Sequence, residues 1–355
     1  MLAACSSSSP GSSAAPSDDG GAIDTGAGDT GSDSGIANPI PAADDQWTWV
    51  DFPESKCASG TPTGIAVNPH AGATNLMFYF EGGGGCTDAS TCWGPTPGAR
   101  NLDGYDSTTF ATAEQRGYPI LDRTHAGNPM SAMNMVYIPY CTGDLHGGSA
   151  EVDLQVSGTT KPTYFWGAKD LDIFLERIAP TFAQTTHVWS MGTSAGGFGA
   201  FLDFDRISRA FPGVRVDIID DSGPPIPPKG GSNNATAFAA WGLVPPAGCT
   251  GCNSLESIFA FDRKSQPASS FGFLSFTQDT TISRFFGYTV AEFPAVIDSF
   301  SSSLAGDPHA ATYLVTNESS HVVESDPTLA PQYFPWLTQM VNDDSAWKNG
   351  GYAHP

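Results

Sequence analysis

Basic residues are scarce in this sequence of 355 residues. It contains 15 lysines and arginines against 37 aspartates and glutamates, which gives a formal net charge of -22 at pH 7. A surface of that charge repels phosphate groups, anionic lipid headgroups and polyanionic sugars. The composition therefore argues against nucleic acid as a partner, and it counts against a polyanionic polysaccharide as a substrate.

Long hydrophobic runs are also missing, because no stretch approaches the about 18 apolar residues of a membrane span. Residues 1–45 lack lysine and arginine altogether and are rich in Ser, Gly, Ala and Asp, a composition that cannot bury enough apolar surface to fold. Within them, Leu2-Ala3-Ala4-Cys5 matches a lipobox, where a bacterial lipoprotein is cut and acylated on its cysteine. We expect a disordered tether over 1–45, anchored to the membrane only by a lipid on Cys5. The alternative is a disordered tail with a stray cysteine.

Cysteine is present in a number that suits disulfides. Setting Cys5 aside leaves six cysteines, and an even number favours disulfides in an exported chain, either a bacterial cell-envelope lipoprotein or a secreted protein. Cys86 lies close to Cys92 and Cys249 lies close to Cys252, which leaves Cys57 for Cys141. A redox motif or half of a zinc site is the alternative for Cys249 and Cys252, but no second ligand pair is spaced to complete zinc binding.

The rest of the chain, residues 46–355, alternates strand-like and helix-like segments. Unbroken apolar strands separated by helices indicate a mostly parallel sheet covered by helices on both faces, here in a single α/β domain. The expected strands are Asn75–Phe80, Met135–Tyr140, His187–Met191, Val214–Ile219, Phe271–Phe276 and Thr312–Val315, and the expected helices include Lys169–Ile178 and Phe198–Phe211.

A candidate nucleophile lies between one of these strands and a helix. Gly192, Ser194 and Gly196 form a G-x-S-x-G pattern directly after the strand that begins at His187. In α/β-hydrolases this strand-turn-helix exposes the serine on a strained turn, and only glycine neighbours allow the close approach. The helix N-terminus also favours the negative charge that develops during acyl transfer. We therefore expect Ser194 to be the nucleophile rather than an ordinary loop serine.

A serine nucleophile needs a histidine base, which follows it along the chain in this fold. Three histidines follow Ser194, and His354 belongs to the terminal tail. His309 precedes the strand Thr312–Val315 and His321 follows it. Because catalytic loops lie at the carboxyl ends of parallel strands, His321 is the expected base.

The acid that orients the histidine should also follow a strand. Asp279 comes after Phe271–Phe276, whereas Asp220 and Asp221 come after the strand next to the nucleophile and remain alternatives. We expect Asp279 to fix the tautomer of His321 without itself taking the proton.

Acyl transfer also needs hydrogen-bond donors for the oxyanion. The glycine-rich loop Glu81–Cys86 follows an early strand, and its backbone amides could supply such donors together with the amide of Ala195. A loop that binds nucleotide phosphates is the alternative, but no Lys-Ser or Lys-Thr follows it.

These residues together resemble the pectin acetylesterase and Notum family of carboxylesterases. The resemblance extends from about Trp47 to His321 and rests on several motifs in the same order. They are Cys57 with Gly60–Gly64, Phe80–Cys86, Thr91–Trp93, Ile138–His146, Gly192–Gly197, Asp279 and Glu318–His321.

The resemblance implies an α/β-hydrolase fold and a triad of Ser194, Asp279 and His321. It places the oxyanion donors on Gly83, Gly84 and Ala195, and the pairing of Cys86 with Cys92 agrees with the family pattern. Plant and animal members commonly carry an aromatic residue at the position of Gly84, so substrate preference is expected to differ.

The expected activity is therefore hydrolysis of a carboxylic ester. We expect an acetyl or other short acyl group on a carbohydrate or a small acylated molecule, and neither a cofactor nor a metal ion. The alternatives are a lipid-type deacylase that removes a longer acyl chain, as animal members of the family do, and a surface lipoprotein without catalysis that serves adhesion.

Overall fold

The computed structural model describes residues 38–231 and 234–355, and these belong to one compact unit. Cys5 and the rest of the expected tether up to residue 37 lie outside the described residues. Two residues before position 46 contact the fold: Ile40 is buried and its N–H donates to Thr181 Oγ1 at 2.7 Å, and Asp45 pairs with His70 at 2.7 Å. The sequence predicts that the folded domain starts at residue 46, and these contacts begin a few residues earlier.

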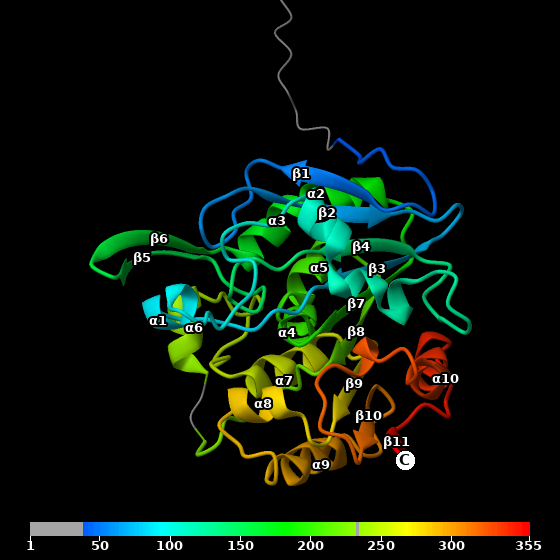
Figure 1. The fold of residues 1–355 in the computed structure, drawn as a ribbon. Helices are drawn as coiled ribbons and strands as arrows, with labels where there is room; N and C mark the ends of the chain where they lie inside the picture. The colour runs from blue at the N-terminus through cyan, green and yellow to red at the C-terminus, as the bar shows by residue number, and fades with distance from the viewer. Residues whose placement is uncertain (1–37, 232–233) are drawn as a thin grey trace, which may run out of the picture. The chain divides into compact units, whose positions relative to one another are not determined.

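A nine-stranded sheet runs through the unit (Figure 1). The strands β1, β2 and β4 pair antiparallel along one edge, and every other pairing in this sheet is parallel. The predicted fold class is therefore confirmed. In spatial order the strands are β1 (Thr48–Phe52), β2 (Thr63–Asn68), β4 (Asn134–Ile138), β3 (Asn75–Phe80), β7 (His187–Thr193), β8 (Arg215–Asp221), β9 (Phe271–Phe276), β10 (Ala310–Thr316) and β11 (Gly350–Ala353).

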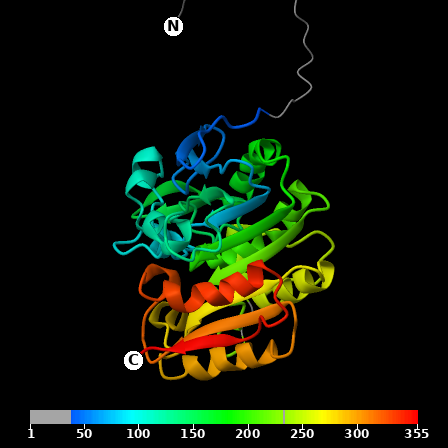
Figure 2. The ribbon, with the colours of Figure 1, turned by 90° about the vertical axis from the view of Figure 1, so that its right-hand side faces the viewer.

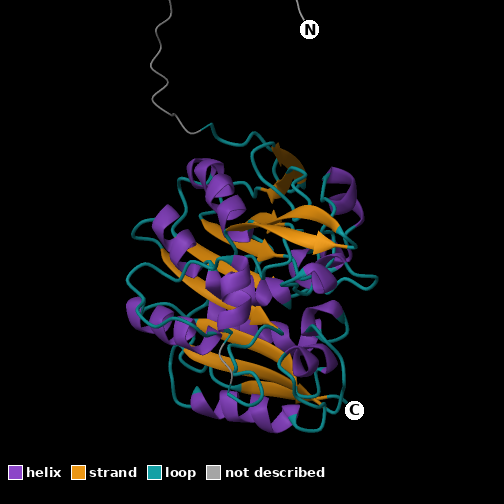
Figure 3. Ribbon diagram, turned by 90° about the vertical axis from the view of Figure 1, so that its left-hand side faces the viewer, coloured by secondary structure: helices purple, strands orange, loops and turns teal. Residues whose placement is uncertain are grey.

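Helices cover both faces of this sheet, as Figures 2 and 3 show from opposite sides. The hydrophobic core on one face includes side chains of α1 (Ala89–Trp93), α3 (Gly167–Thr181), α4 (Ala195–Leu202), α5 (Phe204–Ala210), α6 (Ala235–Trp241), α7 (Leu255–Ser265), α8 (Thr280–Phe285) and α9 (Phe293–Ser303). The core on the other face includes side chains of α2 (Ser107–Thr112), α10 (Ala330–Val341) and the 3₁₀ helices η2 (Pro119–Leu121) and η3 (Val323–Ser325). A further 3₁₀ helix, η1, spans Glu114–Gly117, and a separate hairpin joins β5 (Ala150–Val156) to β6 (Thr159–Phe165).

The strand β3 explains why the sequence shows continuous apolar runs. Leu76, Phe78 and Phe80 belong to the core on one face, and Met77 and Tyr79 belong to the core on the other. Because both faces are buried, both sets of alternating side chains must be apolar.

The helix expected over Phe198–Phe211 is instead two helices, α4 and α5, that meet at Asp203. The N–H of Asp203 donates to the carbonyl of Gly199, and its own carbonyl accepts from the N–H of Ile207, so it ends one helix and begins the next. Aspartate is a poor residue for a helix interior. The carboxyl group of Asp203 is fully buried, and its Oδ1 lies 3.8 Å from Arg206 Nε.

Three disulfides hold the described residues together, and they join the cysteines in the expected pairs. They are Cys57–Cys141, Cys86–Cys92 and Cys249–Cys252. None of the helices in the described part of the chain has the length and apolar character needed to cross a membrane.

Candidate active site

Ser194 lies on a sharp turn between β7 and α4. Its backbone has φ 56° and ψ -119°, a conformation that costs free energy for any residue with a side chain. Two glycines make the turn possible: a Cβ on Gly192 would overlap the carbonyl oxygen of Gly196, and one on Gly196 would overlap that of Phe80. The sequence thus builds a strained turn that exposes the Ser194 hydroxyl at the carboxyl edge of the sheet.

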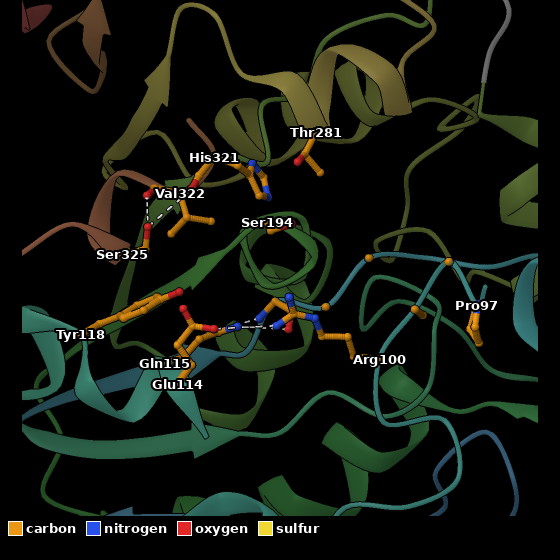
Figure 4. Close-up of a pocket in the computed structure, with 15 residues that line it drawn as sticks. Pro97, Arg100, Glu114, Gln115, Tyr118, Ser194, Thr281, His321, Val322 and Ser325 are labelled. Atoms are coloured by element: carbon orange, nitrogen blue, oxygen red, sulfur yellow. Dashed lines mark hydrogen bonds and ion pairs between the residues drawn. The ribbon is translucent and has the colours of Figure 1, made fainter. Parts of the chain in front are cut away.

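Ser194 and His321 line one cavity of about 380 Å³. In Figure 4 the imidazole of His321 points toward Ser194, while Gln115 and Tyr118 lie on the opposite side of the cavity. The cavity is lined by Gly82, Gly83, Gly84, Pro97, Gly98, Ala99, Arg100, Glu114, Gln115, Tyr118, Ser194, Thr281, His321, Val322 and Ser325.

The imidazole of His321 is held by a buried carboxylate. Its Nδ1–H donates to Asp279 Oδ2 at 2.6 Å. The other oxygen of Asp279 accepts the backbone N–H groups of Thr281 and Ile282, each at 2.8 Å, so this carboxylate also caps the N-terminus of α8. With Nδ1 occupied, Nε2 is the nitrogen that remains to accept a proton. The two residues expected to act together are therefore in contact.

The alternative histidines lie elsewhere. The carbonyl of His309 accepts the N–H of Phe271, which places His309 at the amino end of β10. His354 follows β11, and its Nε2 is 3.7 Å from a carboxylate oxygen of Glu318. Neither histidine lines the cavity.

Asp221, the alternative acid at the end of β8, holds the turn that follows His321. Its two carboxylate oxygens accept the N–H groups of Val323 at 3.0 Å and Glu324 at 2.8 Å. Its backbone carbonyl also accepts the N–H of Ser194 at 2.7 Å. Burial raises the pKa of Asp221 to about 6, although these hydrogen bonds favour the ionised form. One residue thus ties the serine turn to the histidine turn.

Val322, the residue after His321, has an unusual backbone. Its φ of 66° is strained for a β-branched side chain. Its N–H donates to Ser222 Oγ at 3.2 Å, and that hydroxyl donates to Asp221 Oδ1 at 2.8 Å. Asp220, by contrast, accepts the N–H of Gly223 at 2.7 Å, and burial raises its pKa well above the usual range.

The sequence does not identify Gln115 as a site residue, yet its side chain joins the glycine-rich loop to β7. Its Oε1 accepts the N–H of Gly82 at 2.9 Å and the hydroxyl of Thr193 at 3.0 Å, and its Nε2 donates to the carbonyl of Gly82 at 3.2 Å. It is buried in the wall of the cavity. No local pattern identifies it, because its partners lie far from it in the sequence.

Among the described residues, no group accepts a hydrogen bond from the backbone N–H of Gly83, Gly84 or Ala195. Gly84 has φ +83°, and a Cβ on it would overlap the carbonyl oxygen of Gly98. That carbonyl accepts the N–H of Gly85, and the N–H of Arg100 donates to Gly83. The segment 97–100 therefore occupies the space in which a side chain at position 84 would lie, which explains the glycine there.

One group of side chains in the described residues has the proximity of metal ligands. Atoms of Glu318, Asp326 and His354 all lie within 4.8 Å of one another. Of the three, His354 and Glu318 are 3.7 Å apart at their nearest polar atoms, and none of the three residues lines the cavity.

Comparison with known proteins places this chain in a family. The family model for pectinacetylesterase matches residues 45–242, more than half of the chain, so Asp279 and His321 lie beyond the matched region. The palmitoleoyl-protein carboxylesterase Notum of Schmidtea mediterranea is 32% identical over 170 residues, 44% of this chain and 30% of that protein. Human Notum is 27% identical over 175 residues, 47% of this chain and 34% of that protein. The aligned region thus spans about a third of each relative.

A solved structure shares the fold. The structure of the Wnt deacylase Notum from Drosophila has a TM-score of 0.58 and 18% sequence identity, and the match covers 81% of this chain and 88% of that one.

Proposed function

We propose that this chain, which belongs to the pectinacetylesterase family, is a carboxylic ester hydrolase that removes an acetyl or other short acyl group from a carbohydrate. The observation that carries the proposal is the cavity that Ser194 and His321 both line, with the imidazole of His321 pointing toward Ser194. The hydrogen bond from His321 to Asp279 supports it.

In the proposed reaction, His321 Nε2 takes the proton of the Ser194 hydroxyl as its oxygen attacks the ester carbonyl. The negative charge that develops on the carbonyl oxygen is stabilised by the amides of Gly83, Gly84 and Ala195, a contribution of about 3 to 4 kcal/mol per donor. His321 then gives the proton to the leaving alcohol, and the acyl group remains on Ser194. A water molecule attacks this ester in the same way and releases the carboxylic acid. Asp279 keeps the imidazole in the required tautomer.

The lining of the cavity favours a short acyl group. Arg100, Glu114, Gln115, Thr281 and Ser325 bring polar groups to its wall. Burial of each methylene of an acyl chain is worth about 0.8 kcal/mol in an apolar site. Much of that gain is lost where the chain covers polar groups that then lack hydrogen-bond partners. An acetyl group has a single methyl group to bury, so it loses little binding free energy in a cavity with polar walls.

The alternative is removal of a longer acyl chain, which the similarity to the palmitoleoyl-protein carboxylesterases Notum supports. Short-chain and long-chain hydrolysis are distinguished by measuring kcat/KM for p-nitrophenyl esters from acetate to dodecanoate. We expect a maximum at acetate or butyrate and a decrease of at least about tenfold at octanoate. A maximum at octanoate or beyond would overturn the short-chain assignment. Labelling by a fluorophosphonate probe should disappear in Ser194→Ala, and labelling that survives the substitution would remove Ser194 from its role.

The location of the protein is part of the proposal. Three disulfides support an oxidising compartment outside the cytoplasm. We propose that the residues before the fold form a tether with a lipid on Cys5, and that the fold itself is one catalytic domain. Cys5→Ser should move the protein from the detergent phase to the aqueous phase in Triton X-114 partitioning. Unchanged partitioning would exclude the anchor.

A further inference from the structure

A second cavity, of about 400 Å³, adjoins the catalytic one. Pro97 and Ala99 line both cavities, so the segment 97–99 forms a ridge between them. Beyond this ridge the wall carries Trp93, Asp103 and Lys161. A substrate with its ester at Ser194 and its alcohol part extending over the ridge would reach these side chains.

The wall of this second cavity is built before any ligand arrives. The indole N–H of Trp93 donates to Thr163 Oγ1 at 2.8 Å. The adjacent Cys92 is bonded to Cys86, which ends the glycine loop, and the carbonyl of Thr91 accepts the N–H of Gly98 in the ridge. The wall is therefore fixed to the catalytic loop itself, and a preorganised wall reduces the entropy that a ligand must lose on binding.

The side chains at this wall combine an apolar surface with hydrogen-bonding groups. Lys161, from β6 of the protruding hairpin (Figure 1), lies with its Nζ 3.2 Å from the centre of the Trp93 ring. Its ammonium is also 3.6 Å from an oxygen of Asp103. Sugars present C–H groups and hydroxyl groups side by side. The ammonium and the carboxylate match the hydroxyl groups, and the apolar side chains of Leu102 and Val156 in the same lining match the C–H groups.

The charges of the two cavities cancel. Lys161 faces Asp103, and Arg100 faces Glu114 at 4.0 Å, and these are the four ionised side chains of Lys, Arg, Asp and Glu in the two linings. Such exposed pairs are weak and can open to accept hydroxyl groups. A uronate chain would meet both members of each pair, so the two linings offer it no net positive charge to offset the molecule's net charge of -22. This balance selects a neutral ligand.

We propose that the second cavity is a sugar-binding subsite and that the natural substrate is a neutral, acetylated oligosaccharide or polysaccharide. The ester-bearing sugar occupies the catalytic cavity, and its neighbour in the chain crosses the ridge to Trp93 and Lys161. This inference rests on the proposed esterase function and adds the class of the alcohol.

The test compares three esters: p-nitrophenyl acetate, acetylated xylotetraose as a neutral oligomer and acetylated tetragalacturonate as an acidic one. Wild-type protein is measured beside Lys161→Met and Asp103→Asn, with Lys264→Met on the exposed surface of α7 as the matched control. We expect each subsite variant to raise KM for acetylated xylotetraose by about tenfold, the effect of losing a hydrogen bond to a charged group. Activity on p-nitrophenyl acetate should stay within about twofold of wild type, and Lys264→Met should change neither.

The possible outcomes distinguish failure of the esterase function from failure of the sugar-binding subsite. If wild-type protein hydrolyses none of the esters, the esterase function fails. If it hydrolyses p-nitrophenyl acetate but KM for acetylated xylotetraose is the same in wild type and both variants, the subsite is wrong. A higher kcat/KM for the acidic oligomer than for the neutral one would overturn the assignment of a neutral substrate.

Discussion

The ends of the neighbouring strands β8 and β9 carry two carboxyl groups in similar surroundings but with different tasks. Asp221 and Asp279 are both fully buried, and each accepts two backbone N–H groups, Asp279 from the start of α8 and Asp221 from the turn that follows β10. Asp279 uses one oxygen for both N–H groups and leaves the second for His321. In Asp221, both oxygens accept N–H groups from the turn that follows His321. The position at a strand end therefore does not decide which carboxylate orients the histidine; the oxygen that remains free does.

The largest effect should come from removing the carboxylate that binds the imidazole. Asp279→Asn keeps an oxygen for the N-terminus of α8 but places an amide where His321 Nδ1–H needs an acceptor. We expect kcat for p-nitrophenyl acetate to decrease by about 10⁴-fold, as in other triads. The matched control is His309→Ala, because His309 lies at the amino end of β10 and His321 lies beyond its carboxyl end. This variant should retain wild-type kcat. If Asp279→Asn stayed within about tenfold of wild type, the assignment of the acid would be wrong.

Asp221→Asn should have a smaller effect, and a different one. An asparagine has a single acceptor oxygen, so one of the N–H groups of Val323 and Glu324 loses its buried partner. We expect a loss of about 1 to 3 kcal/mol in the free energy of unfolding, measured by urea denaturation. Displacement of the His321 turn should lower kcat by about 10- to 100-fold with KM unchanged. A decrease as large as that of Asp279→Asn, in a protein as stable as wild type, would give Asp221 the role of the acid.

The same comparison shows how far the sequence alone could lead. It predicted β3 and β9 with their bounds, because apolar runs between turn residues suffice to locate buried strands. It could not decide between Asp279 and Asp221 from local pattern, because both follow a strand. The decision depends on where the turn after β10 packs, which is a contact between distant residues.

Two features of the site lay beyond any local pattern. Gln115 bonds to Gly82 and Thr193, and each of these bonds spans more than 30 residues. The contact of Gly84 with Gly98 depends on how the segment 97–100 folds back onto the glycine loop.

A weaker test of the comparison is Ser222→Ala. The hydroxyl of Ser222 accepts the N–H of the strained Val322 and donates to Asp221, so its loss loosens the histidine turn but leaves the bonds of Asp221 to Val323 and Glu324. We expect a loss of about 1 kcal/mol of stability and a decrease in kcat of a few-fold. Ser302→Ala on the exposed surface of α9 is the control. Wild-type kcat in Ser222→Ala would show that Asp221 alone suffices to hold the turn.

The smallest effect concerns the pH dependence of stability. Burial raises the pKa of Asp221 to about 6, above its value in the unfolded chain, so the folded protein binds a proton more tightly. The stability contributed by that proton is complete below the unfolded pKa near 4 and is lost as the pH rises through about 6. Asp221→Asn lacks this proton, so its stability deficit relative to wild type should be largest near pH 4 and should shrink toward pH 7. Urea denaturation at both pH values measures the deficit, and Ser302→Ala, which changes no ionisable group, should show the same difference from wild type at each. A deficit for Asp221→Asn that grows toward pH 7 would mean that the ionised carboxylate stabilises the fold. In that case the hydrogen bonds from Val323 and Glu324 outweigh the cost of its burial.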